Sequence, residues 1–403
     1  MTAWIDVVGI GEDGLEGLSA EAVTALEGAE IIIGGDRHHR IAPNLPAQRV
    51  RWPSPFSKMI GTISRYRGRK VALLVTGDPL WFSAGAKVAA AFPAAEIRFH
   101  PQLSAFQLAC ARMRWSLADI DTLTIHGRPA EQIIPWFAPG ARLAVLTGGS
   151  GDPGAVARML ADRGYGPSRL TVLAELGGPG EARHSALASD WACEDPAASI
   201  PGFHTLCIEC RVEPGITVLP RGPGLPDDAF VNDGNFTKSD VRAATICALA
   251  PRRGELLWDI GCGCGTVSVE WMRCARDARA IGIDPNPARQ EMARKNARAL
   301  GAPGLELIQG RAPEALDGLP DPDAVFIGGG LGREVVEVAL ARIRPAGRIV
   351  ASAVTLESNS LLADIHRQSG GHLVRLSVEM VSALGNQRGW QPMMPVTQWR
   401  YCR

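Results

Sequence analysis

Three closely spaced glycines in the second half of the chain are the clearest candidate for a ligand-binding loop. They follow the apolar run Leu256–Ile260 and form, with the residues between them, the segment Gly261, Cys262, Gly263, Cys264 and Gly265. Glycine lets the backbone approach a ligand closely, and a loop that joins a buried strand to a helix lies where α/β proteins bind cofactors. The pattern predicts a cofactor loop, although three glycines could also serve only a tight turn.

The spacing of this loop and the acids near it indicate which cofactor it would hold. A dinucleotide fingerprint reads G-x-G-x-x-G, whereas this loop reads G-x-G-x-G with Asp259 two residues before the first glycine. S-adenosylmethionine has no phosphate but carries a cationic amino group and a sulfonium, for which a carboxylate at the strand end is a suitable neighbour. Asp284 ends the next apolar run, where a carboxylate can accept hydrogen bonds from ribose hydroxyls. The adenine should then lie in the segment 310–313, which contains Ala312.

A second candidate loop set lies in the first half of the chain. Two apolar runs are followed by turn residues, which are Gly9, Gly11, Gly77, Asp78 and Pro79. The tripeptide Gly-Asp-Pro turns the chain sharply at a strand end and presents backbone groups and one carboxylate to a cleft. The same tripeptide also occurs in plain turns, so both interpretations stay open from the residues alone.

The elements after residue 229 alternate between helix and strand. Apolar runs predict strands at Leu256–Ile260, Ala280–Asp284, Leu305–Ile308, Ala324–Ile327, Arg348–Ala351, Leu373–Ser382 and 395–401. Strands that are apolar throughout and separated by helices predict a doubly wound, seven-stranded Rossmann-like parallel sheet covered on both faces. No helix separates the last two strands, so an antiparallel hairpin should close the edge.

The first half is also α/β but less regular. Strands are predicted at Ile5–Val8, Ile31–Ile33, Val71–Val75, Leu143–Leu146, Leu170–Leu173 and Thr205–Ile208. The pattern resets at 115–128, which indicates two subdomains that meet at a cleft. Prolines and glycines break helix and strand patterns over 213–228, which predicts a linker between a module at 1–212 and a module at 229–403.

The C-terminal module resembles the decarboxylating precorrin methyltransferases of cobalamin biosynthesis. The resemblance rests on Phe236–Arg242, Leu257–Glu270, Gly310–Glu314 and Asp323–Gly329. It implies cofactor contacts from Thr237, the 261–265 loop, Asp284 and Ala312. Cys262 and Cys264 depart modestly from the family, which usually has a small residue between the first glycines.

The N-terminal module resembles the tetrapyrrole methyltransferase superfamily, and within it the precorrin enzymes that methylate carbon 5. The motifs are the 8–14 and 75–85 segments, Pro101–Gln107 with Ser104 and Ala105, His126–Arg128 and Leu173–Gly177. The resemblance implies a two-subdomain fold with S-adenosylmethionine held between the subdomains, at Gly9, Gly11, 77–79, Ser104 and Ala105. The opening glycine segment departs from the commoner Gly-x-Gly-Pro-Gly-Asp of the superfamily.

A chain with both modules resembles the bifunctional enzymes of this pathway. The resemblance implies methylation of a precorrin at carbons 5 and 15 and decarboxylation of an acetate side chain, giving precorrin-8X. It implies two S-adenosylmethionine sites, one per module, and a tetrapyrrole partner. It assigns no catalytic group, for which Asp78 and Lys238 are the candidates.

The substrate would carry several carboxylates, so its pocket needs fixed positive charge. The chain has five lysines among its 42 basic residues, and the arginine fork suits carboxylates. We expect Lys238 and Arg242, four residues apart on one helix face, and Arg128 to bind the substrate. The alternatives are solvated helix charges and, for the arginine excess, a GC-rich genome.

The composition of the chain indicates which partners and which cellular location to expect. Lys+Arg and Asp+Glu are 42 each, which disfavours nucleic acid as the main partner. No apolar run reaches the roughly 18 residues that cross a bilayer, so no membrane span is expected. Nine scattered cysteines and the absence of a signal-peptide pattern predict a reducing cytoplasm.

Two motifs that could suggest a metal site are interpreted as structural. Cys207 and Cys210 have a zinc-like spacing but no second pair nearby, so no metal site is expected. His38 and His39 should mark a polar turn near the substrate mouth. A homo-oligomer is expected. The alternatives are a methyltransferase for another tetrapyrrole or for RNA, and a non-enzymatic carrier.

Overall fold

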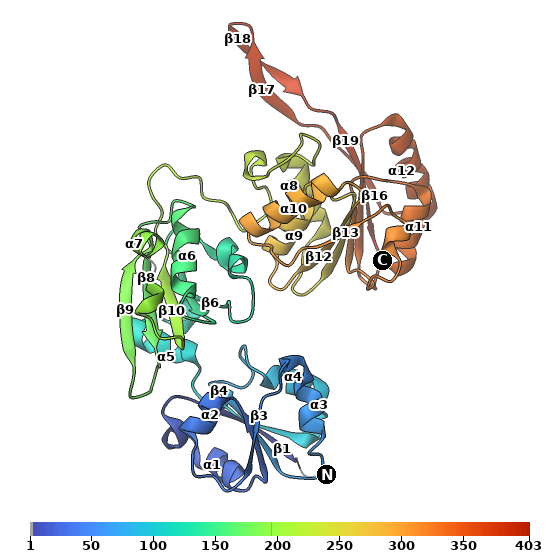
Figure 1. Cartoon of the computed structure of the whole chain (residues 1–403). Helices are drawn as coiled ribbons and strands as arrows, with labels where there is room; N and C mark the ends of the chain where they lie inside the picture. Colours follow the sequence, from blue (N-terminus) through green and yellow to red (C-terminus); the bar gives the residue numbers. More distant parts are fainter. Residues whose placement is uncertain (1–2, 195) are drawn as a thin grey trace. The chain divides into compact units, whose positions relative to one another are not determined.

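The computed structural model describes residues 3–194 and 196–403. The chain divides into an N-terminal unit, up to Ala130 and from Phe137 to Ile216, and a C-terminal unit of Glu131–Trp136 and Thr217–Arg403. Figure 1 shows both units as sheets with helices beside them. The two-module α/β fold predicted from the sequence is confirmed.

The N-terminal unit contains two five-stranded sheets. The first is parallel, in the order β3-β2-β4-β1-β5, with β1 Ile5–Ile10, β2 Ile31–Gly34, β3 Gln48–Arg51, β4 Val71–Thr76 and β5 Ile97–His100. Its helices are α1 Ala20–Glu27, α2 Asp36–Ile41, α3 Met59–Ser64 and α4 Gly85–Ala91. The central strands are mostly apolar and, apart from Thr76 at the end of β4, buried, because helices pack on the sheet.

The second sheet of this unit is mixed and has the order β6-β7-β10-β8-β9. Its strands are β6 Asp121–Thr124, β7 Arg142–Leu146, β8 Arg169–Ala174, β9 Ala182–Leu187 and β10 His204–Glu209. The helices are α5 Ala105–Met113, α6 Asp152–Ala161 and α7 Ala188–Cys193. The change of sheet lies between His100 and Asp121, close to the predicted reset of the pattern at 115–128.

The C-terminal unit is built on a seven-stranded sheet in the order β13-β12-β11-β14-β15-β19-β16. Its strands are β11 Leu256–Ile260, β12 Arg279–Asp284, β13 Glu306–Gln309, β14 Ala324–Ile327, β15 Arg348–Ala353, β16 His372–Leu376 and β19 Val396–Cys402. The helices are α8 Ser239–Leu249, α9 Thr266–Cys274, α10 Pro287–Ala299, α11 Arg333–Arg342 and α12 Leu356–Ser369. The first five strands are parallel, and β19 runs antiparallel between β15 and β16.

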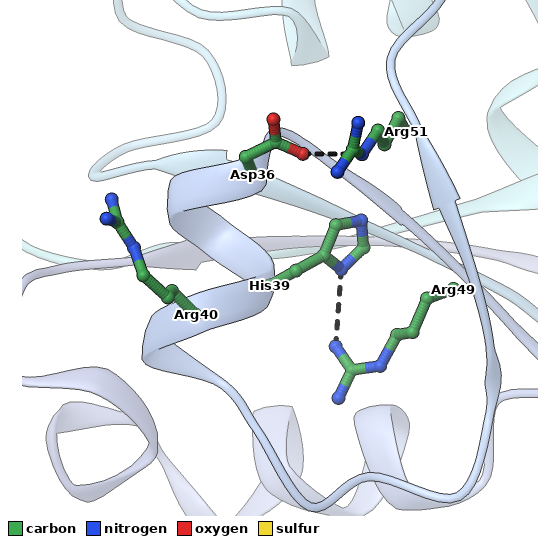
Figure 2. Close-up of a pocket in the computed structure, with 5 residues that line it drawn as sticks. All are labelled: Asp36, His39, Arg40, Arg49 and Arg51. Atoms are coloured by element: carbon green, nitrogen blue, oxygen red, sulfur yellow. Dashed lines mark hydrogen bonds and ion pairs between the residues drawn. The ribbon is translucent and has the colours of Figure 1, made fainter.

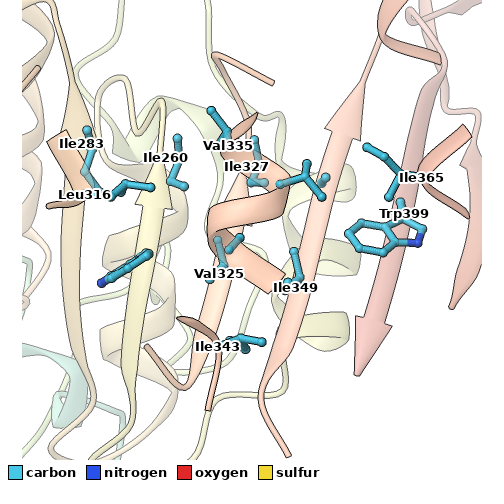
Figure 3. Packing of buried hydrophobic residues seen from close by; sticks show 14 of the residues in the cluster. Ile260, Ile283, Leu316, Val325, Ile327, Val335, Ile343, Ile349, Ile365 and Trp399 are labelled. Carbon is cyan, nitrogen blue, oxygen red and sulfur yellow. The ribbon is translucent and has the colours of Figure 1, made fainter. Parts of the chain in front are cut away.

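Alternate residues of these strands pack on opposite faces, as the doubly wound prediction requires. Figure 3 shows one face, where Val325, Ile349 and Trp399 meet α11 and α12 side chains such as Val335 and Ile365. On the other face, Leu257 and its neighbours pack against α8 and α9. The predicted seven-stranded, doubly wound sheet is confirmed.

Two predictions about this unit differ from the structure. The apolar run Leu373–Ser382 is two elements, β16 and β17 Glu379–Leu384, and β17 pairs with β18 Gln387–Pro392 in a separate ribbon. The predicted linker is also partly folded into the unit. Leu225 is fully buried, and its backbone N–H donates to the Glu270 carboxylate at 2.9 Å. Residues from about 219 onward therefore belong to the C-terminal unit.

Candidate functional site

The glycine loop after β11 lies against a second glycine loop after β14. Gly261 has a φ of +71°, and a Cβ on it would lie 2.5 Å from Gly329 Cα. Gly265 has a φ of +79°, and a Cβ on it would lie 2.9 Å from Ala293 Cβ of α10. Glycine is required at both positions by conformation and by space. The loop therefore presents its backbone at the carboxyl end of the sheet.

Asp259 lies beneath this loop with one free carboxylate oxygen. The residue is 1% exposed, and its Oδ2 accepts from Ser268 N at 3.0 Å and Ser268 Oγ at 2.6 Å. Its Oδ1 is buried and has no hydrogen-bond partner among the described residues. Burial, with a smaller contribution from the nearby Asp284, raises the pKa of this carboxyl from 3.8 to about 6, although the Ser268 hydrogen bonds act in the opposite direction. A buried, unpartnered carboxylate oxygen fits a cationic group such as the amino group of S-adenosylmethionine.

Asp284 at the end of β12 connects the loops of neighbouring strands. Its Oδ2 accepts from Gly263 N at 3.0 Å and its Oδ1 from Asn286 N at 2.8 Å. Its backbone carbonyl accepts from Gly310 N at 3.3 Å, which places the segment that carries Ala312 beside it. A carboxylate has about four acceptor positions, so Asp284 keeps capacity for two ribose hydroxyls. The structure thus brings the predicted loop, Asp284 and the Ala312 segment to one edge.

The segment before α8 is tied onto the glycine loop. The Asn296 side chain donates to the carbonyls of Val231 and Cys264, both at 2.9 Å. Arg289 and Asp233 form an ion pair at 2.7 Å, and Asn235 O lies 3.9 Å from a Cβ built on Gly263. These contacts hold the 231–237 segment, which ends at Thr237, close to the predicted cofactor loop.

Lys238 is the residue before the first turn of α8 and stays partly exposed. Its Nζ lies 3.6 Å from the centre of the Phe236 ring and donates to Gly234 O at 3.3 Å. Neither contact neutralises its charge, so the ammonium can still meet a substrate carboxylate. Cys262 and Cys264 are buried, and burial raises the pKa of both thiols, that of Cys264 to about 11. They are packing residues rather than nucleophiles.

The prediction that Arg242 binds substrate is wrong. Its side chain is fully buried and donates to Glu270 at 2.6 Å, to Thr237 O at 2.6 Å and to Leu225 O. Spacing placed Arg242 one turn from Lys238 but could not show that this side of α8 faces the core. Its role is to hold the 225–237 segment in place.

In the N-terminal unit, three predicted segments converge at the carboxyl end of the first sheet. A Cβ on Gly9 would lie 2.0 Å from Gly77 O, and a Cβ on Gly77 would lie 3.0 Å from Ser104 Cα. Gly77 has a φ of +61° and donates from its N–H to Ile10 O at 3.1 Å. Ser104 caps α5, which begins at Ala105. Because β1 lies between β4 and β5, its following loop with Gly11 joins the same edge.

Asp78 and Pro79 form the turn after β4. Asp78 Oδ1 accepts from Leu80 N at 2.7 Å, and Pro79 O lies 2.2 Å from a Cβ built on Gly85. Three exposed apolar side chains, Leu80, Trp81 and Leu103, adjoin this turn. The remaining Asp78 oxygen can accept a hydrogen bond from a ligand or lie beside a cationic group, and the exposed apolar side chains next to it can contact an apolar part of the same ligand.

Arg128 lies in an exposed turn after β6. It makes no ion pair with any residue in the part of the chain that the structure describes. The neighbouring His126 Nδ1 lies 3.2 Å from Thr147 O, which fixes the turn beside the end of β7. Arg128 is therefore available to an anionic ligand.

A polar cluster that the sequence did not reveal lies beside Thr76. Arg37 forms an ion pair with Glu12, donates to Thr76 Oγ1 at 2.5 Å and lies 4.0 Å from the centre of the Phe203 ring. Burial lowers the pKa of Arg37 to about 10 and that of His38 to about 3, so His38 is neutral at physiological pH. These residues come from four separate segments, so no local motif could show their meeting.

A basic groove of about 580 Å³ adjoins this cluster, lined by Asp36, His39, Arg40, Arg49 and Arg51. Figure 2 shows Arg51 paired with Asp36, at 2.6 Å, and Arg49 turned toward His39. Arg49 also donates to the carbonyls of Ala42 and Pro43. Arg40 is exposed and has no ion pair among the described residues. The groove carries net positive charge at the carboxyl edge of the sheet.

The structure also shows the surroundings of the Cys207 and Cys210 pair and bears on the expectations about metal sites and membrane spans. Cys207 and Cys210 are both buried, which raises the pKa of each thiol to about 12. Within the described residues, no group of three or more His, Cys, Asp or Glu side chains is placed to hold a metal ion. None of the helices described is both long and apolar enough to span a bilayer.

Two family patterns match the chain, one in each half. Residues 228–403 match the precorrin methyltransferase domain, and residues 5–190 match the tetrapyrrole (corrin/porphyrin) methylases. A precorrin-6Y C(5,15)-methyltransferase [decarboxylating] from Sinorhizobium is 40% identical over 100% of this chain and 97% of its own length. The chain belongs to the precorrin-6Y C(5,15)-methyltransferases. Methyltransferases of this family use S-adenosylmethionine.

Partial relatives of this family were also found. A probable cobalt-precorrin-6B C(15)-methyltransferase (decarboxylating) from Pyrobaculum calidifontis is 38% identical over 34% of this chain and 72% of its own. The crystal structure of the C-terminal domain of a precorrin-6Y C5,15-methyltransferase from Rhodobacter capsulatus is 47% identical, with a TM-score of 0.44, and covers 46% of this chain and 100% of that one.

Proposed function

We propose that the chain methylates a precorrin macrocycle at carbons 5 and 15 and decarboxylates an acetate side chain, giving precorrin-8X. S-adenosylmethionine would bind at two sites, one in each unit. The observation that carries the proposal is that each unit brings its predicted glycine and acid residues to the carboxyl edge of a parallel sheet. The full-length similarity to bifunctional relatives supports it.

We assign the two positions to different units. The N-terminal unit, similar to tetrapyrrole methylases, would act at carbon 5. The C-terminal unit would act at carbon 15 and decarboxylate, in line with a C(15)-methyltransferase relative that matches only 34% of this chain. The nine free cysteines, none in a disulfide, support location in the cytoplasm.

Methyl transfer and decarboxylation require few specific catalytic side chains. When bound, S-adenosylmethionine supplies an electrophilic methyl group for an in-line displacement. The unit then has to align the donor with the accepting carbon and exclude water, and Asp259, Asp284 and the glycine loop would hold the donor for that alignment. Decarboxylation releases carbon dioxide from the acetate and leaves an electron pair that the conjugated ring accepts. A proton then completes the methyl group, so no protein nucleophile is needed.

Incubation with the precorrin and a labelled methyl donor, followed by mass detection, tests the proposal. Two labelled methyl groups and loss of one carboxyl group support it. Calorimetric titration with S-adenosylmethionine should independently give two sites per chain. A product with no added methyl group, or a single donor site, would contradict the assignment.

Donor binding in the C-terminal unit should depend on pH through Asp259. Above about pH 6 the buried carboxylate is ionised and attracts the cationic amino group; below it, a proton must be displaced. Affinity should therefore fall as pH decreases through 6, by up to about tenfold per pH unit. Calorimetry from pH 5 to 8 measures this, and Asp259→Asn should bind more weakly with a flat profile. The same pH slope in the variant would remove Asp259 from the site.

The basic groove is our candidate for binding substrate carboxylates in the N-terminal unit. Replacing Arg40 and Arg51 together with glutamine should weaken binding of uroporphyrin III, an octacarboxylate probe, by about tenfold or more, since each charge-assisted contact contributes roughly 1.5 to 3 kcal/mol. Absorbance titration at fixed salt measures the affinity. Arg65→Gln is the matched control, because Arg65 is exposed at the end of α3, before β4 begins and so at the opposite edge. Equal affinities in all three proteins would exclude the groove.

A further inference from the structure

Thr76, the last residue of β4, is contacted by two side chains of α2. Along the strand it lies on the same face as Leu74, which is buried beside α1. The Arg37 guanidinium donates to Thr76 Oγ1 at 2.5 Å, and His38 Nε2 lies 3.0 Å from the same oxygen. Thr76 is partly exposed and directly precedes the turn at 77–79. Its hydroxyl is therefore held at the sheet edge that carries the N-terminal candidate site.

The hydrogen bonds of His38 determine which of its ring nitrogens carries the proton. The backbone N–H of Gly35 donates to Nδ1 at 3.1 Å, so Nδ1 is the unprotonated nitrogen. Burial lowers the pKa of this imidazole to about 3, so the ring holds a single proton, which is on Nε2. The 3.3 Å contact between the Arg37 guanidinium and His38 Nε2 then joins two donors and is not a hydrogen bond. His38 is therefore a donor to Thr76, as Arg37 is.

Two donors on one hydroxyl oxygen determine what the hydroxyl proton can do. The two hydrogen bonds use both lone pairs of the Thr76 oxygen, so its own O–H has to donate away from Arg37 and His38. Within the described ranges, the structure contains no hydrogen bond in which this hydroxyl is the donor. A hydroxyl that accepts from a guanidinium is also a stronger donor, because linked hydrogen bonds polarise one another. Thr76 is thus an oriented donor with no acceptor of its own.

A carboxylate is the acceptor that suits this donor. Arg37 is paired with Glu12, so its charge is compensated and it acts on Thr76 rather than on a ligand. The adjoining basic groove, which α2 also lines, attracts anionic groups to the same edge. Hydrogen bonds to an ionised acceptor are roughly twice as strong as those between neutral groups. Both ligands of the proposed function carry carboxylates, one on the methionine part of the methyl donor and several on the precorrin.

We propose that the Thr76 hydroxyl, oriented by Arg37 and His38, binds a carboxylate of the ligand at the N-terminal site, either from the precorrin or from the methionine part of S-adenosylmethionine. Thr76 is then a binding residue, and Arg37 and His38 are positioning residues that act through it. The inference rests on the proposed function of the N-terminal unit and names a group that recognises its ligand.

Affinity measurements on the full-length chain test the hydroxyl. Every chain carries Gly261→Ala, whose added Cβ would lie 2.5 Å from Gly329 Cα, so that donor binding reports the N-terminal site. Thr76→Val replaces the hydroxyl with a methyl group and should weaken binding of one ligand about tenfold or more. Thr76→Ser keeps the hydroxyl and should bind like the parent. Thr24→Val is the matched control, because the Thr24 hydroxyl is exposed and donates to Ala20 O of its own helix at 2.8 Å.

Two titrations distinguish the two sources of the carboxylate. Weaker binding of uroporphyrin III with unchanged S-adenosylmethionine affinity assigns Thr76 to the precorrin. The reverse assigns it to the donor, and S-adenosylmethioninamine, which lacks the carboxylate, should then bind equally to the parent and to Thr76→Val. Equal affinities of the parent and Thr76→Val for both ligands, or a Thr76→Ser chain as weak as Thr76→Val, would overturn the proposal. A parent chain that binds neither ligand would overturn the proposed function of the N-terminal unit, and this inference with it.

A double-mutant cycle tests the positioning role of His38. In His38→Asn the side-chain oxygen can still accept from Gly35 N–H, but the donor to Thr76 is lost. His38→Asn should weaken the same ligand as Thr76→Val, and the double variant should bind no more weakly than Thr76→Val alone. Fully additive losses would overturn the role of His38 in orienting Thr76. Equal melting temperatures of the parent and the variants show that each remains folded.

Discussion

Replacing Arg242 with methionine should lower the free energy of unfolding of the C-terminal unit by about 3 to 5 kcal/mol, the cost typical of breaking a buried ion pair on one side. Arg242 and Glu270 are both fully buried and 2.6 Å apart. Without the guanidinium, the donors to the Glu270 carboxylate that remain among the described residues are the N–H groups of Gly224 and Leu225, at 2.8 and 2.9 Å. Urea denaturation followed by tryptophan fluorescence measures the change.

Two further variants separate this stability effect from a binding effect. Arg253→Met removes an exposed pair with Asp277, at 3.1 Å, and should cost less than about 1 kcal/mol. Combining Arg242→Met with Glu270→Leu should recover part of the loss, because no uncompensated charge remains. Unchanged stability with weaker tetrapyrrole binding in Arg242→Met would return Arg242 to the substrate site.

Gly261→Ala should reduce methylation at carbon 15 and the loss of carbon dioxide by about 100-fold, while methylation at carbon 5 continues. The added Cβ would lie 2.5 Å from Gly329 Cα, and the backbone has a φ of +71°, so both glycine loops must move. A displacement of about 1 Å in a donor site is enough for an effect of this size. Mass spectrometry of the product should find one added methyl group and the acetate retained.

The matched control is a glycine that has the same backbone conformation as Gly261 but open space around its Cα. Substituting it by alanine tests the effect of backbone strain without a steric clash. Gly254 has a φ of +76° and nothing within 4 Å of a built Cβ, so Gly254→Ala should change stability slightly and products not at all. Two added methyl groups at the normal rate in Gly261→Ala would show that the glycine loop does not hold the donor of the second methylation.

The strands that the sequence predicted and those that it missed differ in their place in the sheets. In the N-terminal unit the missed strands are β3, β5, β6 and β9, and these are the four edges of its two sheets. An edge strand is partly exposed and can be short and polar, as Gln48–Arg51 is, so it lacks the apolar run of a central strand. In the C-terminal unit, β16 and β17 read as one run because no glycine or proline separates Leu376 from Glu379.

The residues of the candidate site also divide into those that the sequence could predict and those that it could not. The glycine loops, Asp259, Asp284 and Asp78 could be predicted because each follows an apolar run at a strand end. The burial of Arg242 could not, since the spacing of charges on a helix does not show which side faces the core. The Arg37 cluster and the basic groove depend on contacts between distant segments, which no single stretch of sequence contains.

The packing of residues 219–228 determines where the two units could be separated into independent polypeptides. Leu225 fills the core beside Val269 and Ala297, and the N–H groups of Gly224 and Leu225 satisfy the Glu270 carboxylate. A chain beginning at Ala229, where the composition suggests a boundary, would lack Leu225. The Glu270 carboxylate and the space that Leu225 fills in the core would then be exposed to water. A break between Ile216 and Leu219 would keep these contacts of Leu225 and Glu270 within the C-terminal polypeptide. Where two separate genes encode the two activities, the gene for the C-terminal unit therefore has to include this ten-residue segment, 219–228.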